Sequence, residues 1–158
     1  MAFRLHSRLV ALNIAAIAVA TVIVGYFFFG GSLRSAFESE IQQQLYRSAT
    51  LAKSYVRVQR GISDPVDLAG NISELLDVRV TIIAPDGKVL GDSDLSRENL
   101  SGVANHSDRS EVIDALRTGR GSAMRSSATI GIPFIYVATR LDDGRILRVA
   151  CRCPTSKH

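Results

Sequence analysis

The sequence is poor in the residues that build metal sites and disulfides. It has no tryptophan, three histidines and two cysteines among 158 residues. Cys151 and Cys153 are separated by one residue, and a bridge between them would close a small ring that joins nothing distant in the fold. The sequence also lacks a nucleophile–base pair, a glycine-rich phosphate loop and an HExxH pattern. We therefore expect no enzyme activity, no metal and no cofactor.

The excess of positive charge does not indicate nucleic-acid binding. The chain has 19 basic and 15 acidic residues, and Arg4 and Arg8 at the N-terminus supply two of the basic ones. In the remainder the two signs are interspersed, without a basic stripe or a platform of aromatic residues. Nucleic acid is therefore not an expected partner.

The most distinctive segment is an apolar run from Leu9 to Phe29, which contains no Asp, Glu, Lys, Arg or His. A helix of this length spans about 30 Å, the thickness of the hydrocarbon core of a bilayer. Because Arg4 and Arg8 precede the run, the positive-inside rule predicts a cytoplasmic N-terminus and an extracytoplasmic domain. A cleaved signal peptide is the alternative, but its apolar region is usually shorter and ends in small residues.

Residues 32–59 have the periodicity of a long amphipathic helix. Leu33, Phe37, Ile41 and Leu45 follow one another at spacings of four, so they share one face. This face must be buried, either on the sheet that follows or against the same helix of a second subunit. Because spacings of four do not make a heptad repeat, we expect packing on the chain's own sheet.

The remaining residues predict a small α+β domain with a five-stranded antiparallel sheet. Glycine and proline in residues 61–65 end the long helix, and Pro85 to Lys88 form a hairpin turn in which Gly87 takes a positive φ. Asp108 or Ser110 is expected to cap a helix that ends at Gly119. The expected elements are a short helix over 65–77, strands over 78–84 and from 89, a loop over 92–107, that helix, and strands over 121–129, 134–141 and 145–150.

These elements, in this order, resemble a known family. The hairpin VTIIAPDGKVLGDSD, the loop and helix NHSDRSEVIDAL and the final strands FIYVATRL and RILRVA resemble the extracytoplasmic input region of bacterial sensor histidine kinases of the phosphate-regulon type. The resemblance implies a PAS-like (Cache/PDC-type) sensor domain and a homodimer with paired long helices. It covers the chain from the apolar run to Ala150.

The sequence departs from this family after Ala150. Such kinases continue into a second transmembrane helix, a HAMP linker, a phospho-accepting histidine helix and an ATP-binding domain, and the sequence shows none of them. We therefore expect an input region without kinase activity. The expected organisation is a cytoplasmic N-terminus (1–8), a transmembrane helix (9–29), a juxtamembrane helix (32–60), a PAS-like sensor domain (61–150) and an atypical tail (151–158).

Polar residues of the loop and the later strands form a candidate ligand site. Arginines beside hydroxyl groups suit a carboxylate or a phosphate, because the guanidinium offers paired hydrogen bonds to an anion. The alternative is a structural network in which the acidic residues bind backbone donors of the loop and its helix. The candidates are Asp92, Asp94, Asn105, His106, Arg109, Arg125, Ser127 and Tyr136.

Two functions are compatible with these features. The first is a membrane-anchored sensory input domain of a two-component sensor kinase, in which a stimulus changes the packing of the long helix on the sheet. In that case Phe37, Ile41 and Leu45 are the expected signalling and dimerisation residues. The second is a stand-alone anchored module that binds a ligand or acts as a scaffold without signalling output.

Overall fold

The computed structural model describes residues 2–59, 64–126 and 133–152, apart from the side chains of residues 2–9 and 29–34. The chain divides into two compact units, residues 1–39 and residues 40–158, and each is described by itself. Helix α1, Ala2–Val58, contributes to both units.

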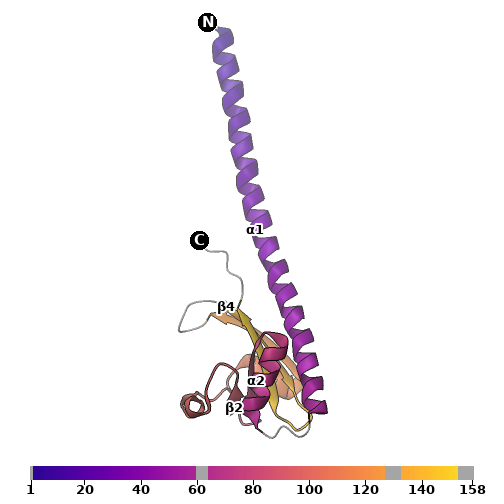
Figure 1. The fold of residues 1–158 in the computed structure, drawn as a ribbon. Helices are drawn as coiled ribbons and strands as arrows, with labels where there is room; N and C mark the ends of the chain where they lie inside the picture. Colours follow the sequence, from indigo (N-terminus) through magenta and orange to yellow (C-terminus); the bar gives the residue numbers. More distant parts are fainter. Residues whose placement is uncertain (1, 60–63, 127–132, 153–158) are drawn as a thin grey trace. The chain divides into compact units, whose positions relative to one another are not determined.

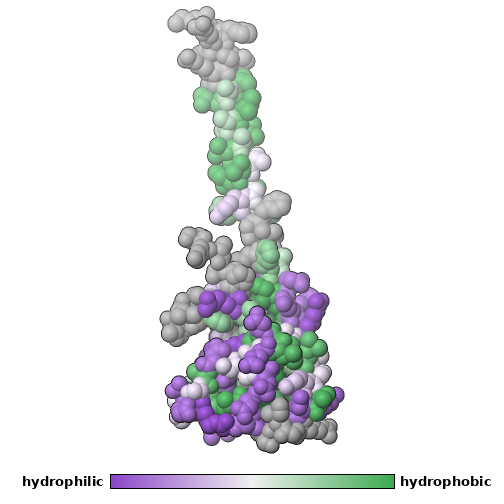
Figure 2. Space-filling model, viewed as in Figure 1, coloured by the Kyte–Doolittle hydropathy of each residue, from purple (hydrophilic) through white to green (hydrophobic). Residues whose placement is uncertain are grey.

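The first unit contains a helix segment that is long and apolar enough to cross a membrane. This segment is Val10–Phe28, and it is not buried within the described residues. Figure 2 shows its apolar side chains as a green region. Gly30 and Gly31 follow it and lie within α1 rather than ending a helix. A glycine lowers helix stability by about 1 kcal/mol but, unlike proline, keeps its N–H donor.

The second unit is built on an antiparallel sheet of five strands (Figure 1), which confirms the predicted α+β class. The strand order is β2-β1-β5-β4-β3, so β5 lies in the middle and pairs with β1 and β4. The sheet is open, because β2 and β3 are its edges. The strands are β1 (Arg79–Ile83), β2 (Val89–Asp92), β3 (Arg120–Ser126), β4 (Pro133–Arg140) and β5 (Ile146–Arg152).

One face of the sheet is apolar and packs against two helices. Residues 40–58 of α1 contribute Leu45, Ala49 and Ala52 to this core, and Ile41 packs against it. Helix α2, Pro65–Leu76, covers the same face (Figure 1). The predicted packing of the long helix on the chain's own sheet is therefore present. The buried strand residues of this face are Val80, Ile82, Ile135, Val137, Leu147 and Val149.

The opposite face is apolar only where helix α3, Ser110–Thr118, covers it. Val112 and Ala115 of α3 pack with Ile83, Ala138 and Ile146 of the sheet. Because successive strand residues point to opposite faces, the neighbours of these residues belong to the first core. The rest of this second face is polar and forms the candidate site.

Local signals explain where the helices and turns lie. The Asp64 carboxylate caps α2 by accepting from the N–H groups of Val66 and Asp67, and Pro65 is the first helical residue. Gly87 turns the β1–β2 hairpin with φ +88°, as predicted. Gly91 of β2 has no room for a side chain, because the Pro65 backbone lies against it. This close approach places the start of α2 on the sheet.

Two local predictions are wrong. The N-cap of α3 is Arg109, which makes no side-chain capping hydrogen bond, so neither Asp108 nor Ser110 caps the helix. Glu111 in the first turn supplies the negative charge that a helix N-terminus favours. The predicted loop after Asp92 contains a 3₁₀ helix, η1, Arg97–Gly102. Because this helix buries no residue, its sequence has no apolar periodicity from which it could be predicted.

The two leucines at positions 45 and 51 of α1 provide a matched test of the packing. Leu45 is 2% exposed, whereas Leu51 is 60% exposed. Leu45→Ala should lower the free energy of unfolding by about 2–5 kcal/mol, because it removes buried methyl groups and leaves a cavity. Leu51→Ala should change it by less than about 0.5 kcal/mol. Denaturant unfolding of the full chain in detergent measures both, and equal effects would contradict this packing.

Candidate functional site

A buried carboxylate lies at the centre of the polar face. Glu111 of α3 is fully buried and accepts two hydrogen bonds from Arg125 of β3, at 2.6 and 2.9 Å. Arg148 Nη1 of β5 lies 3.5 Å from the same carboxylate. Burial raises the pKa of Glu111, but the hydrogen bonds from Arg125 and the two positive charges outweigh it, and the net pKa is lowered. Glu111 is therefore an anion inside the protein.

Tyr136 of β4 lies beneath both arginines of this cluster. The guanidinium carbon of Arg125 is 4.3 Å from the centre of the tyrosine ring, and that of Arg148 is 5.1 Å away. A cation over an aromatic face is attracted to the ring, most strongly where water is excluded. Phe134 stacks beside Tyr136 on the same strand. The ring thus holds both guanidinium groups beside Glu111.

A chain of hydrogen bonds extends the cluster to the edge of the sheet. Arg148 Nη2 donates to Thr81 Oγ1 at 3.1 Å, and Thr81 in turn donates to the Asp92 carboxylate at 2.7 Å. Arg79 Nε donates to the same carboxylate at 3.1 Å. Asp92 also accepts from the backbone N–H of Asp94. The network therefore connects β5, β1 and β2 through one buried carboxylate.

Two guanidinium donors have no hydrogen-bond partner within the described residues. They are Arg148 Nε and Arg109 Nε, and both atoms are buried. Arg148 is 5% exposed, and burial lowers its pKa although Glu111 and Asp92 counteract this effect. Arg109 Nε lies 3.5 Å from the exposed Asp108 carboxylate without a hydrogen bond. Leaving a buried donor without a hydrogen bond lowers the stability of the folded protein by about 1–3 kcal/mol. The two donors therefore require a physical reason.

His106 lies just before α3 and is partly buried. Its Nδ1 is 2.8 Å from the carbonyl oxygen of Ala104, which only accepts, so Nδ1 carries a proton. Burial lowers the pKa of His106, and the charges of Arg148 and Arg109 lower it further. Near neutral pH the ring is therefore uncharged, with its lone pair on Nε2.

The structure brings together most of the predicted site residues, but in different roles. Arg125 and Tyr136 belong to the Glu111 cluster, and Asp92 belongs to the network at the sheet edge. Asp94 is exposed, 3.5 Å from Arg79. Asn105 anchors the loop, because it donates to the Asp86 carbonyl and accepts from the Ser107 N–H. Ser127 lies outside the described residues. Asp92 thus matches the structural alternative, and Asn105, a ligand candidate, holds the loop instead.

Sequence reasoning missed the two residues that join these groups, Glu111 and Arg148. Arg148 alternates with Leu147 and Val149, so the period of two placed it on the face opposite the apolar core. Glu111 stands one helical turn before Ala115, on the buried side of α3. Two signals were available in the sequence: Arg148 is a charged residue inside a short apolar strand, and Glu111 is a charged residue on the apolar side of a helix.

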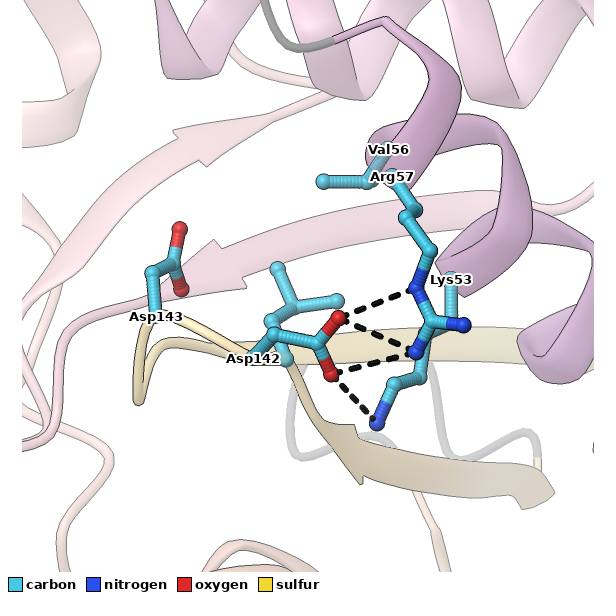
Figure 3. Close-up of a pocket in the computed structure, with 6 residues that line it drawn as sticks. Lys53, Val56, Arg57, Asp142 and Asp143 are labelled. Atoms are coloured by element: carbon cyan, nitrogen blue, oxygen red, sulfur yellow. Dashed lines mark hydrogen bonds and ion pairs between the residues drawn. The ribbon is translucent and has the colours of Figure 1, made fainter.

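A separate hollow of about 280 Å³ lies between the end of α1 and the β4–β5 turn. Figure 3 shows Asp142 facing Arg57 and Lys53, at 3.0 and 3.4 Å. Hydrogen bonding from Arg57 lowers the pKa of Asp142. Lys53 also donates to the Arg140 carbonyl. Asp142 is thus paired with Lys53 and Arg57, and these ion pairs attach α1 to the β4–β5 turn.

Comparisons with known proteins identify the fold but no family. No family model and no curated protein sequence matches the chain. A crystal structure of the Bacillus subtilis YkuI protein, which has an EAL domain and was solved with c-di-GMP and calcium, is similar, with a TM-score of 0.59 and 16% identity. The match covers 82% of this chain and 37% of that chain. At this identity the similarity concerns the fold alone.

Glu111 and Asp114 of α3 provide a matched pair for testing the cluster. Glu111→Gln leaves Arg125 and the buried Arg148 without their counter-charge and should lower the free energy of unfolding by about 3 kcal/mol or more. Asp114→Asn breaks an exposed pair with Arg117 and should have little effect. Denaturant unfolding at neutral pH measures both. A Glu111→Gln protein as stable as the Asp114→Asn protein would contradict this assignment.

The lowered pKa of His106 predicts a pH dependence of stability. The unfolded protein binds a proton at this residue below about pH 6.5, whereas the folded protein binds it only at lower pH. Stability should therefore fall as the pH drops below about 6.5, and His106→Gln should remove this part of the dependence. Thermal unfolding between about pH 7.5 and 5 tests it, with His6 and His158 present in both proteins. Parallel curves for the two proteins would contradict it.

Proposed function

We propose that the chain is the membrane-anchored extracytoplasmic input domain of a two-component sensor histidine kinase. The apolar span is compatible with a single-pass membrane protein. The proposal adds that the N-terminus is cytoplasmic, that the sheet domain lies outside the inner membrane, and that the chain carries no enzymatic activity itself. The antiparallel sheet with helices on its faces agrees with the PAS-like domain that the resemblance implies.

The observation that carries this proposal is the double use of α1. The helix contains the apolar span, and its residues 40–58 form one wall of the sheet core through Leu45, Ala49 and Ala52. A change in the sheet therefore acts directly on the chain segment that follows the span. The ion pairs of Lys53 and Arg57 with Asp142 fix the end of the same helix.

We also propose a homodimer that forms through α1. Ile41 and Leu45 are directed into the sheet core of their own chain, so the dimer contact in residues 40–58 uses the opposite side of the helix. Gln44, Arg47 and Ser54 are exposed there. Phe37 is 60% exposed and belongs to the other unit of the chain.

Cysteine cross-linking in membranes tests both the dimer and the response. Cys151 and Cys153 are first replaced by serine, and single cysteines are placed at Gln44, Arg47 or Ser54, with Leu45→Cys as the buried control. We expect a disulfide-linked dimer from at least one exposed position and none from position 45. A candidate stimulus should change the cross-linking rate.

Orientation is tested on the same membranes. A cysteine at Asp86, in the exposed β1–β2 turn, should react with a membrane-impermeant thiol reagent in intact spheroplasts. Absence of labelling there would contradict the orientation.

Absence of cross-links at all three exposed positions would contradict the dimer and favour a stand-alone module.

A further inference from the structure

We propose that Arg148, Arg109 and His106 form a binding site for a small oxyanion, a carboxylate or a phosphate. The site deepens the proposed sensory function by naming the class of ligand. It differs from the arrangement expected from the sequence, in which Arg125 was a ligand-binding residue.

The buried charges on this face are not balanced. Among the buried and partly buried residues, two arginine–carboxylate pairs are complete, Arg79 with Asp92 and Arg125 with Glu111. These pairs use both buried carboxylates. Arg148 shares the Glu111 carboxylate with Arg125, and the carboxylate beside Arg109 in the described residues is the exposed Asp108. The interior of this face thus holds more positive than negative charge, which favours an added anion.

Two buried N–H donors near this face have no hydrogen-bond partner among the described residues. Arg148 Nε and Arg109 Nε are both buried without a hydrogen bond, although the other nitrogens of Arg148 contact Glu111 and Thr81. Arg125 is already engaged by both oxygens of Glu111 and by the Tyr136 ring. The proposed site requires one anion to accept from both Nε–H groups, and an oxyanion has enough acceptors for two such bonds. Hydrogen bonds of this charged type are about twice as strong as neutral ones.

The protonation of His106 depends on the charges around its ring. Its Nδ1–H is engaged by the Ala104 carbonyl, so the uncharged ring offers only a lone pair at Nε2. The charged groups that act on the ring are Arg148 of β5 and Arg109 at the start of α3, both positive. A bound anion offsets these charges and allows Nε2 to gain a proton and donate. Binding should therefore take up a proton and become tighter as the pH falls.

Anion titrations of the full chain in neutral-lipid nanodiscs test the site. Inorganic phosphate and acetate are titrated separately at constant ionic strength with chloride as the background ion, and calorimetry measures binding. We expect saturable binding of one or both, and the two titrations distinguish a phosphate ligand from a carboxylate ligand. Saturation by neither anion would overturn the proposal.

Arg109→Gln is the main variant, because Arg109 lies at the edge of the cluster and is partly exposed. It should weaken binding about tenfold or more. Arg117→Gln is the matched control, since it makes the same change of charge on α3 at an exposed position. Arg148→Lys keeps the positive charge near Glu111 but removes Nε–H, and it should also weaken binding. Unchanged binding in Arg109→Gln, or an equal loss in Arg117→Gln, would overturn the proposal.

Sulfate titrations at about pH 7.5 and 5.5 test the role of His106, because the charge of sulfate is constant over this range. Sulfate should bind more tightly at the lower pH, and His106→Gln should remove the difference. A pH dependence that persists in His106→Gln would overturn the proton-coupled part. These titrations do not measure signalling, so their failure leaves the cross-linking results for the sensory function unaffected.

Discussion

The polar face depends on the buried carboxylate of Glu111. A lone ionised carboxylate cannot remain in a protein interior, so α3, β3 and β5 must meet where Arg125 and Arg148 neutralise it. This requirement adds to the two buried apolar residues of α3, Val112 and Ala115, in fixing the position of the helix on the sheet. It also brings Tyr136 beneath both arginines. The cluster therefore orders one side of the domain, and hydrophobic packing orders the other.

The elements could be predicted from the sequence because their signals are local. The α2 helix begins at Asp64–Pro65, the hairpin turns at Gly87, and α3 ends at Gly119 with φ +90°. Each of these positions has a residue whose chemistry determines the backbone there. The face of α1 that packs on the sheet was predictable for the same reason, since Ile41 and Leu45 repeat at helical spacing.

The candidate site was predicted less well, because it depends on pairing between distant strands. Arg148 reaches Thr81 only because β5 pairs with β1, and the register of that pair is not encoded near either residue. The partner of Arg125 was missed because Glu111 resembles any acidic residue in a first helical turn. Asn105 was assigned to the ligand, whereas the Asp86 carbonyl across the neighbouring turn engages it.

The strand β5 connects the two faces on which the proposals rest. Arg148 points to the polar cluster, and its neighbours Leu147 and Val149 point to the core that contains Leu45 of α1. Because β5 is hydrogen-bonded on both sides, it cannot shift without β1 and β4. A displacement of Arg148 that reaches its backbone would therefore move β1, β5 and β4 together against α1. That is the physical route by which occupancy of a small site on one face would reach the helix on the other.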